Sequence, residues 1–269
     1  MSFLRHDAAL RALLLVKGHP YDRNALAALF ESDRGVVATT VEHPAAEQFL
    51  DPEAAAPYDA LVFYDMPGLD FGPGFPPRVV PPSERARKGF DALLEKGTGF
   101  VFLHHAIAGW PGWEAYGDAV GARFLYAPGT VRGTPYPDSG YRHDVTHRVR
   151  PVDPDHPVSA GVEQGFEVTD EVYLCPVFED RVTPLFRSDH RFEAAGFYSA
   201  AEALRGRMHS NEGWSHPTGS NLIGWTQRIG RSVTVTLTCG DGPSALGHPA
   251  LRRVVMNALR WVAAETGRA

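Results

Sequence analysis

The sequence has few cysteines, no excess of positive charge and no long apolar run, and each absence excludes a class of protein. Its 269 residues include only Cys175 and Cys239, too few for a disulfide framework or a cysteine-rich zinc site. Lys and Arg number 26 against 32 Asp and Glu, a formal net charge of −6, which disfavours nucleic acid as a partner. The longest apolar runs, such as 13–16, are too short to span a bilayer, and residues 1–11 carry charges where a signal peptide is apolar. We therefore expect a cytoplasmic protein with no nucleic-acid or membrane partner.

Several cofactor and nucleophile motifs are also missing. The sequence contains no Gly-x-x-x-x-Gly-Lys-Ser/Thr loop and no Gly-x-Ser-x-Gly pattern, and Lys17-Gly18-His19 stands where a dinucleotide-binding glycine motif would follow the first predicted strand. These absences predict no nucleotide or flavin cofactor. Histidine, by contrast, occurs 12 times. Because histidine titrates near neutral pH and binds metals, the placement of these residues is the main functional clue.

Apolar runs that end in turn residues alternate with helical patterns along the chain. Strands that are apolar on both faces and separated by helices are typical of a parallel sheet covered on both sides. Ser83 suits a helix N-cap and Gly97 a helix C-terminus. The patterns predict one α/β domain over residues 1–269, with strands at 12–16, 35–41, 58–64, 100–103, 167–177, 182–188 and 231–238, and helices at 24–30, 83–96 and from 249 onward.

Two proline- and glycine-rich segments, 66–82 and 126–141, are too long to be simple connections. We expect each to lie at the rim of a pocket or in a subunit interface. Their aromatic residues favour burial in a homodimer, the commonest symmetric assembly; these are Phe71, Phe75, Tyr126, Tyr136 and Tyr141.

Polar side chains follow four of the predicted strands. They are His19, Asp65, the adjacent pair His104 and His105, and Asp241. Ligands of open parallel sheets bind beyond the carboxyl ends of the strands, so we expect these residues to share a ligand site. The alternative is that each histidine only caps a loop backbone group.

A second constellation combines Asp170, Glu171 and Tyr173 on one predicted strand. Adjacent carboxylates are costly to bury without partners. Glu171 is therefore either a general base that faces the histidines or one half of a structural ion pair on an edge strand. A mixed set of His19, one of the adjacent histidines and one of these carboxylates would suit zinc or iron, but no helical His-x-x-x-His pattern supports it, and we predict no metal.

Aromatic residues follow the adjacent histidines closely. Flat aromatic faces beside hydrogen-bonding groups suit the apolar C–H faces of a sugar ring. Trp110 lies in the loop after the histidines and is assigned to the pocket, whereas Tyr116 is assigned to packing of a short helix against the sheet.

Short motifs in a fixed order resemble the ThuA-like, or trehalose-utilisation, family over about residues 12–264. They are Phe102-Leu103-His104-His105-Ala106, Trp110, Trp113-Glu114-Ala115-Tyr116-Gly117, Gly121 to Phe124, Asp155-His156-Pro157-Val158, Asp170-Glu171-Val172-Tyr173, Gly230-Arg231-Ser232-Val233 and the helix from Asn257 to Trp261. The resemblance implies a class I glutamine amidotransferase-like fold, a flavodoxin-like three-layer sandwich with a mainly parallel central sheet. It also implies a link to carbohydrate metabolism, including oxidised (keto) sugars.

Two features depart from the related proteins. The amidotransferases carry a nucleophilic cysteine on a sharp strand-to-helix turn, where this chain has His104-His105-Ala106, and Ala250 replaces the glutamate of their His-Pro-Glu motif. A glutaminase activity is therefore not expected. The family also tends to carry Gly-His after the final strand, where this chain has Gly240-Asp241.

The sequence thus predicts an enzyme that acts on a sugar or keto-sugar by acid–base chemistry. The alternative is a non-catalytic sugar-binding or scaffold module that kept the amidotransferase-like fold without its nucleophile. The candidate catalytic residues are His104, His105 and Glu171. The candidate substrate-binding residues are His19, Asp65, Trp110, Asp170, Tyr173 and Asp241.

Overall fold

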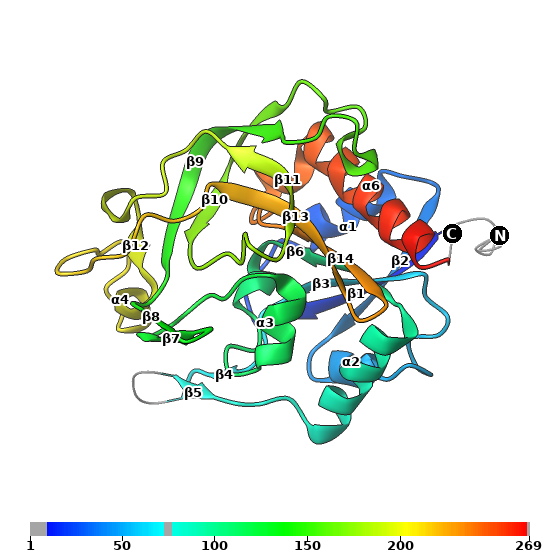
Figure 1. The fold of residues 1–269 in the computed structure, drawn as a ribbon, viewed down its shortest axis with the longest axis horizontal. Helices are drawn as coiled ribbons and strands as arrows, with labels where there is room; N and C mark the ends of the chain where they lie inside the picture. The colour runs from blue at the N-terminus through cyan, green and yellow to red at the C-terminus, as the bar shows by residue number, and fades with distance from the viewer. Residues whose placement is uncertain (1–9, 73–76, 268–269) are drawn as a thin grey trace.

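The computed structural model describes residues 10–72 and 77–267, which are organised around one ten-stranded sheet (Figure 1). The strand order is β10-β9-β11-β13-β14-β6-β3-β1-β2, and β12 pairs with β9 outside this path. The sheet has two halves. Five strands, from β14 to β2, are parallel, and the strands on the other side of β14 are antiparallel.

The parallel half is built from short apolar strands that are buried on both faces. β3 (Ala60–Asp65) and β6 (Gly99–Leu103) are buried at every residue, and β1 (Leu10–Lys17) is buried over its five central residues. Such runs are expected of parallel strands covered by helices on both sides. The half is completed by β2 (Val36–Glu42) and β14 (Ser232–Leu237).

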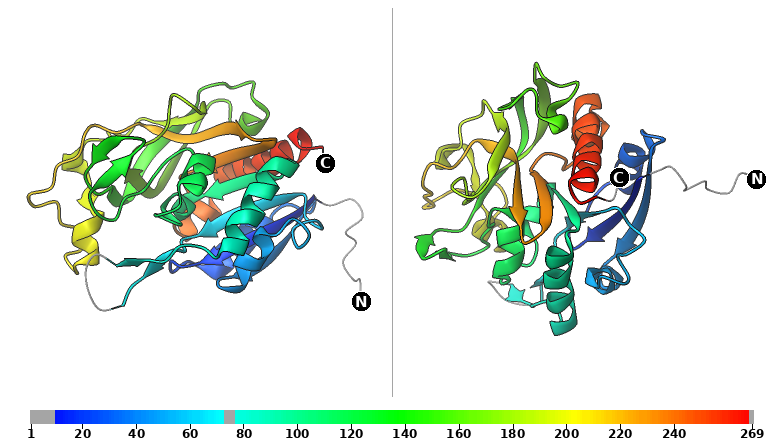
Figure 2. Two further views of the ribbon diagram at one scale, coloured as in Figure 1. Left: turned by 60° about the horizontal axis from the view of Figure 1, so that its bottom comes forward. Right: turned by 45° about the vertical axis from the view of Figure 1, so that its right-hand side comes forward.

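Helices cover both faces of the parallel half, which gives the predicted three layers (Figure 2). One face carries α1 (Arg23–Glu31), α5 (Pro243–Gly247) and α6 (Pro249–Glu265). The other carries α2 (Glu84–Lys96) and α3 (Glu114–Val120). The expected caps of α2 are present, since the Ala86 N–H donates to Oγ of Ser83 at 3.1 Å and Gly97 has φ of +83°.

The antiparallel half extends the sheet beyond β14. It consists of β13 (Leu222–Ile229), β11 (Thr183–Ser188), β9 (Gly140–Pro151) and β10 (Phe166–Leu174). The sequence patterns predicted the positions of β10 and β11, but β13 and most of β9 were not predicted. Their apolar residues alternate or are interrupted by Arg, Gln and Gly, so no continuous apolar run marks them.

Short elements occupy the two proline-rich segments. The first holds β4 (Leu69–Asp70) and β5 (Arg78–Val79), and the second holds β7 (Gly129–Val131) and β8 (Thr134–Tyr136). Phe75 lies outside the described residues. The remaining small elements are β12 (Tyr198–Ser199) and α4 (Ala200–Leu204).

The predicted α/β fold class is confirmed, with one local correction. The strand predicted over 167–177 ends at Leu174, so Cys175 follows the strand instead of lying within it. Among the helices of the described residues, none has the length and apolar character needed to cross a membrane.

Candidate functional site

The carboxyl ends of three parallel strands bring together most of the expected polar residues. The ring centroids of His19 and His105 are 5.0 Å apart, and those of His104 and His105 are 5.4 Å apart. Asp241 lies within 3.3 Å of His104. The expectation that β1, β6 and β14 deliver these residues to one place is therefore met.

His104 stands on a sharp turn directly after β6. Its φ of +49° lies in the left-handed region, which costs a non-glycine residue about 1–3 kcal/mol and is found mainly at functional positions. Nδ1 of its ring donates to the carbonyl oxygen of Thr238 at 2.8 Å, which directs Nε2 the other way. Nε2 lies 2.8 Å from the Tyr173 hydroxyl, 3.2 Å from Glu171 and 3.3 Å from Asp241.

The surroundings of His104 favour its charged form. Burial alone would lower the pKa of the imidazole, because the low-dielectric interior disfavours the cation. The hydrogen-bonded carboxylates of Asp241 and Glu171, with Asp170 nearby, outweigh burial and raise the pKa of His104 to about 10. His104, which is itself 1% exposed, is thus held among carboxylates that favour its imidazolium form.

A β-bulge in β9 lies opposite Glu171. In the pairing of β10 with β9, Asp170 opposes Val145 and Val172 opposes Arg142, so two residues of β9, His143 and Asp144, face Glu171 alone. A bulge re-aims a side chain of the bulged strand, and here Nδ1 of His143 contacts the Glu171 carboxylate. Asp170 and Glu171 are neighbours on the other strand and both are buried, Asp170 against the loop after β14 and Glu171 against His104 and His143.

Asp170 holds the loop after β14 in place. Its carboxylate accepts the backbone N–H groups of Gly240 at 2.5 Å and Asp241 at 3.1 Å, and the Tyr64 hydroxyl donates to the Gly240 carbonyl at 2.8 Å. Burial raises the pKa of Asp170 to about 6, although the charge of His104 and these N–H groups act in the opposite direction. Asp170 was predicted to bind substrate, and in the structure it positions Asp241.

His105 has a different environment from its neighbour. Its Nε2 donates to the carbonyl oxygen of Tyr64 at 3.1 Å, while Nδ1 is buried and has no hydrogen-bond partner among the described residues. Burial and the charges of His104 and His19 keep the pKa of His105 well below its usual value. His105 is therefore neutral, with its free lone pair on Nδ1.

A cavity of about 210 Å³ opens beside these residues. Its polar and aromatic wall is formed by His19, Phe124, Tyr126, Tyr141, His143 and Tyr173. Both proline-rich segments reach it, the first through Met66 and Phe71 and the second through Tyr126 and Tyr141. These segments thus lie at the rim of a pocket, which is one of the two positions expected for them.

Two predicted site residues take other positions. Trp110 is 5% exposed, packs against Trp113 and His43, and is not part of the cavity wall. Asp65 is the buried last residue of β3, and one of its carboxylate oxygens lies 2.6 Å from Nε2 of His43. The core role expected for Tyr116 holds, since its ring is buried and its hydroxyl donates to the carbonyl of Ala106.

Sequence reasoning missed two histidines of this region. Nδ1 of His143, on β9, lies 3.3 Å from the Glu171 carboxylate and the ring lines the cavity. His43 contacts Asp65 as described. His43 directly follows β2, a predicted strand, so the pattern that identified His104 applied to it and was overlooked. His143 lies within β9 at the bulge, and its position depends on strand pairing that the sequence does not display.

Two groups of side chains are close enough to share a metal ion. One is His19, His105 and Asp241, and the other is His104, Glu171 and Asp241.

The two cysteine thiols are buried, which raises the pKa of Cys175 to about 12 and that of Cys239 well above its usual value. Both are therefore protonated and poorly nucleophilic.

Comparison with known proteins identifies the family. The family model ThuA, described as trehalose utilisation, matches residues 11–262. The chain belongs to the ThuA family. Among curated proteins, no sequence matches this ThuA chain.

Solved structures share the ThuA fold at low sequence identity. A ThuA-like protein from Parabacteroides merdae is 14% identical, with a TM-score of 0.66 and coverage of 95% of this chain and 90% of that one. One from Bacteroides uniformis is 15% identical, with a TM-score of 0.58 and coverage of 97% and 95%. PurLQS from Thermotoga maritima is 11% identical, with a TM-score of 0.52 and coverage of 94% and 99%, which relates the fold to that of the amidotransferases.

Proposed function

We propose that this ThuA protein is an enzyme that acts on a sugar or keto-sugar by acid–base chemistry in the cavity at the strand ends. The observation that carries the proposal is the contact of His104 with Glu171, Asp241 and Tyr173 directly behind the cavity wall. Titratable groups held in a buried network beside a cavity are typical of catalytic sites, because proton transfer needs groups of unlike pKa.

The size and lining of the cavity favour a single sugar ring. Pockets for drug-sized ligands enclose about 300–1,000 Å³, and this cavity, at about 210 Å³, is smaller. The rings of Phe124, Tyr126 and Tyr173 offer flat apolar faces, and His143 and the Tyr173 hydroxyl offer hydrogen bonds. A monosaccharide unit, free or at the end of a longer sugar, suits this space better than a whole disaccharide.

The geometry indicates a separate role for each residue of the site. Tyr173 and His143 line the cavity and would touch the sugar, and Glu171 contacts both His143 and His104. We assign Glu171 the role of base, which accepts a proton from a sugar carbon next to a carbonyl or from a sugar hydroxyl. His143 or Tyr173 is the residue in direct contact with the sugar. His104 is a positioning residue in this scheme, since its charge fixes the carboxylates that surround it.

The rival proposal is a sugar-binding module without catalysis. It is favoured by the absence of a cysteine on the turn after β6, where related amidotransferases carry their nucleophile. If this rival proposal holds, the experiment below will show sugar binding without exchange of carbon-bound protons.

Proton exchange in deuterated water tests the proposal. The protein is incubated with glucose, fructose, trehalose or an oxidised keto derivative of glucose, and loss of carbon-bound proton signals is followed by NMR. Exchange with at least one sugar, reduced about 100-fold or more in Glu171→Gln and Tyr173→Phe, is expected, since general acid–base groups contribute about 10²–10⁴-fold. The matched control is Glu179→Gln, a carboxylate paired with Arg187 away from the cavity, which should leave exchange unchanged.

Absence of proton exchange with every sugar, together with normal sugar binding, would establish the non-catalytic sugar-binding module instead.

We further propose a cytoplasmic location and a homodimer. The location is supported by the similarity to a cytoplasmic protein, STM3548 from Salmonella typhimurium, which is 11% identical with a TM-score of 0.57. The dimer is supported by the exposed apolar side chains of the first proline-rich segment, Phe71, Val79 and Val80.

A further inference from the structure

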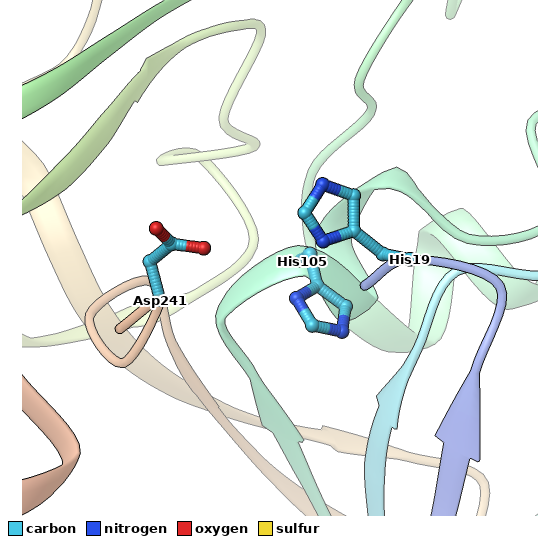
Figure 3. Close-up of side chains that lie close together, drawn as sticks. All are labelled: His19, His105 and Asp241. Carbon is cyan, nitrogen blue, oxygen red and sulfur yellow. The ribbon is translucent and has the colours of Figure 1, made fainter. Parts of the chain in front are cut away.

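Three side chains from the ends of three strands face a common space beside the cavity. His19 follows β1, His105 follows β6 and Asp241 follows β14, and each offers one ligand atom within 4.8 Å of the others. Figure 3 shows the carboxylate of Asp241 on one side of this space and the two imidazole rings on the other. We propose that this chain binds a divalent transition-metal ion through His19, His105 and Asp241.

The strongest support is the unpartnered nitrogen of His105. A carbonyl oxygen can only accept, so the Nε2 atom that contacts the Tyr64 carbonyl carries the ring hydrogen and Nδ1 carries the lone pair. That lone pair has no partner among the described residues, in a side chain that is 1% exposed. A buried polar atom without a hydrogen bond costs about 1–3 kcal/mol. A ring nitrogen that faces a ligand while the other donates to a backbone carbonyl is the arrangement of a metal-bound histidine.

The other two ligands stand on backbone that is held in place. Asp170 fixes the loop of Asp241 through two N–H groups, as described above. His19 follows Gly18, whose φ is +95° and where a Cβ atom would lie 2.3 Å from the carbonyl oxygen of Met66. A larger residue at position 18 would force the end of β1 away from β3, and His19 with it. The site is therefore organised before an ion arrives.

The ligand set indicates the class of ion. Two imidazoles and one carboxylate suit Zn²⁺ or Fe²⁺, whereas Ca²⁺ and Mg²⁺ prefer oxygen ligands alone. Ligand atoms around a tetrahedral zinc lie roughly 3.4 Å apart, so the set has to close slightly from its spacing of up to 4.8 Å. His19 is half-buried, and its Nδ1 donates to the carbonyl oxygen of Pro20 at 2.7 Å, so its Nε2 carries the lone pair. Three protein ligands leave one position open to the cavity, which His19 also lines.

The second possible set, His104 with Glu171 and Asp241, is less suited to an ion. Nε2 of His104 already has the Tyr173 hydroxyl and two carboxylates within 3.3 Å, so its polar atoms are satisfied by the protein itself. An ion there would have to displace these contacts. At His105 it would supply a contact that is missing.

An ion at this position would be able to polarise a carbonyl or hydroxyl oxygen of a ligand in the cavity. This consequence rests on the proposed function, whereas binding of the ion does not. The two are therefore measured separately, the ion by metal content and affinity and the function by proton exchange.

The test uses the full chain, freed of any histidine tag and stripped with a chelator. Zn²⁺ is titrated by calorimetry, Co²⁺ by its visible absorption, and bound metal is counted by mass spectrometry after dialysis against Zn²⁺ or Fe²⁺. We expect one ion per chain. Loss of a second-shell partner weakens metal binding by about 10–100-fold, so His19→Ala and Asp241→Asn, which remove ligands, should weaken it by at least about tenfold.

The matched control is His143→Gln, which removes a cavity histidine outside the ligand set and should leave the affinity unchanged. His19 and Asp241 are both partly exposed, so their variants should fold, and circular dichroism checks this. Absence of stoichiometric binding would overturn the proposal. So would binding that survives both substitutions, or binding that is lost in Glu171→Gln but not in His19→Ala, since the latter result would place the ion in the second set.

Discussion

The two halves of the sheet contribute different things to one site. The parallel half supplies histidines from the ends of short apolar strands, held by helices on both faces. The antiparallel half supplies Asp170, Glu171 and Tyr173 from a strand whose pairing is bulged. Strand ends place residues by topology alone, whereas the contact of Glu171 with His143 also depends on a bulge in β9. The rigidity of the site therefore depends on the junction of the two halves, where Asp170 of β10 holds the loop after β14.

The largest difference between the halves should appear in core truncations. Phe63 of β3 is 1% exposed and packs against the rings of Phe90, Phe100 and Phe102. Phe63→Ala should lower the free energy of unfolding by about 3–5 kcal/mol, as expected for a buried phenylalanine. Phe166→Ala, in β10, should cost less, because that ring is 9% exposed and its one described ring contact is His248. Urea unfolding of both variants measures this, and equal losses would contradict the idea that the parallel half is the better packed.

One pH effect on stability should come from the antiparallel half, through His147 of β9. Burial lowers the pKa of His147 from 6.5 to about 4, with the charge of His190 acting in the same direction. As the pH falls below 6.5 the unfolded chain takes up this proton before the folded chain does, so stability is lost between pH 6.5 and about 4. The shift corresponds to at most about 3 kcal/mol.

His147→Asn keeps a group able to bond the Ser188 hydroxyl, which lies 2.8 Å from Nδ1 of His147. In this variant the slope of unfolding free energy against pH over that window should fall by about one proton. The measurement is urea denaturation at several pH values. An unchanged slope would mean that His147 does not titrate with folding.

The junction between the halves can be loosened without touching the histidines. Asp170→Asn removes the charge that accepts two backbone N–H groups from Gly240 and Asp241. We expect a loss of about 1–3 kcal/mol in stability, because one buried donor is left without a good acceptor. Hydrogen exchange should then show faster opening of residues 239–242 than of β6. Protection that stays the same in both would show that Asp170 does not hold this loop.

The smallest effect should come from a helix cap remote from the junction. Oγ of Ser83 accepts the Ala86 N–H at the start of α2, and Ser83→Ala should cost about 1 kcal/mol. Ser83→Asp should restore most of the loss, as measured by thermal unfolding. Proton exchange with sugars should be equal in both variants, and a change in exchange would mean that α2 communicates with the site.

The features that could be predicted from the sequence are those that depend on the residues of a single strand or helix. The apolar run before His104 and the cap at Ser83 are local signals, and both were found from residue types alone. The contact of Glu171 with His143 was not found, because it depends on a bulge in the pairing of two strands. Trp110 was misplaced for a related reason, since a loop tryptophan can turn toward the core or the cavity and only tertiary packing decides. β13 was not predicted, because its apolar residues are interrupted by Gly224, Gln227 and Arg228.

A crystal structure of the protein soaked with glucose or its keto derivative would show directly whether a sugar binds in the cavity. We expect a sugar ring against Phe124 and Tyr126, with one oxygen within about 3.2 Å of the Tyr173 hydroxyl or of His143. A sugar bound only in the separate groove beside Arg252 and Arg253, with the cavity at the strand ends empty, would contradict this expectation.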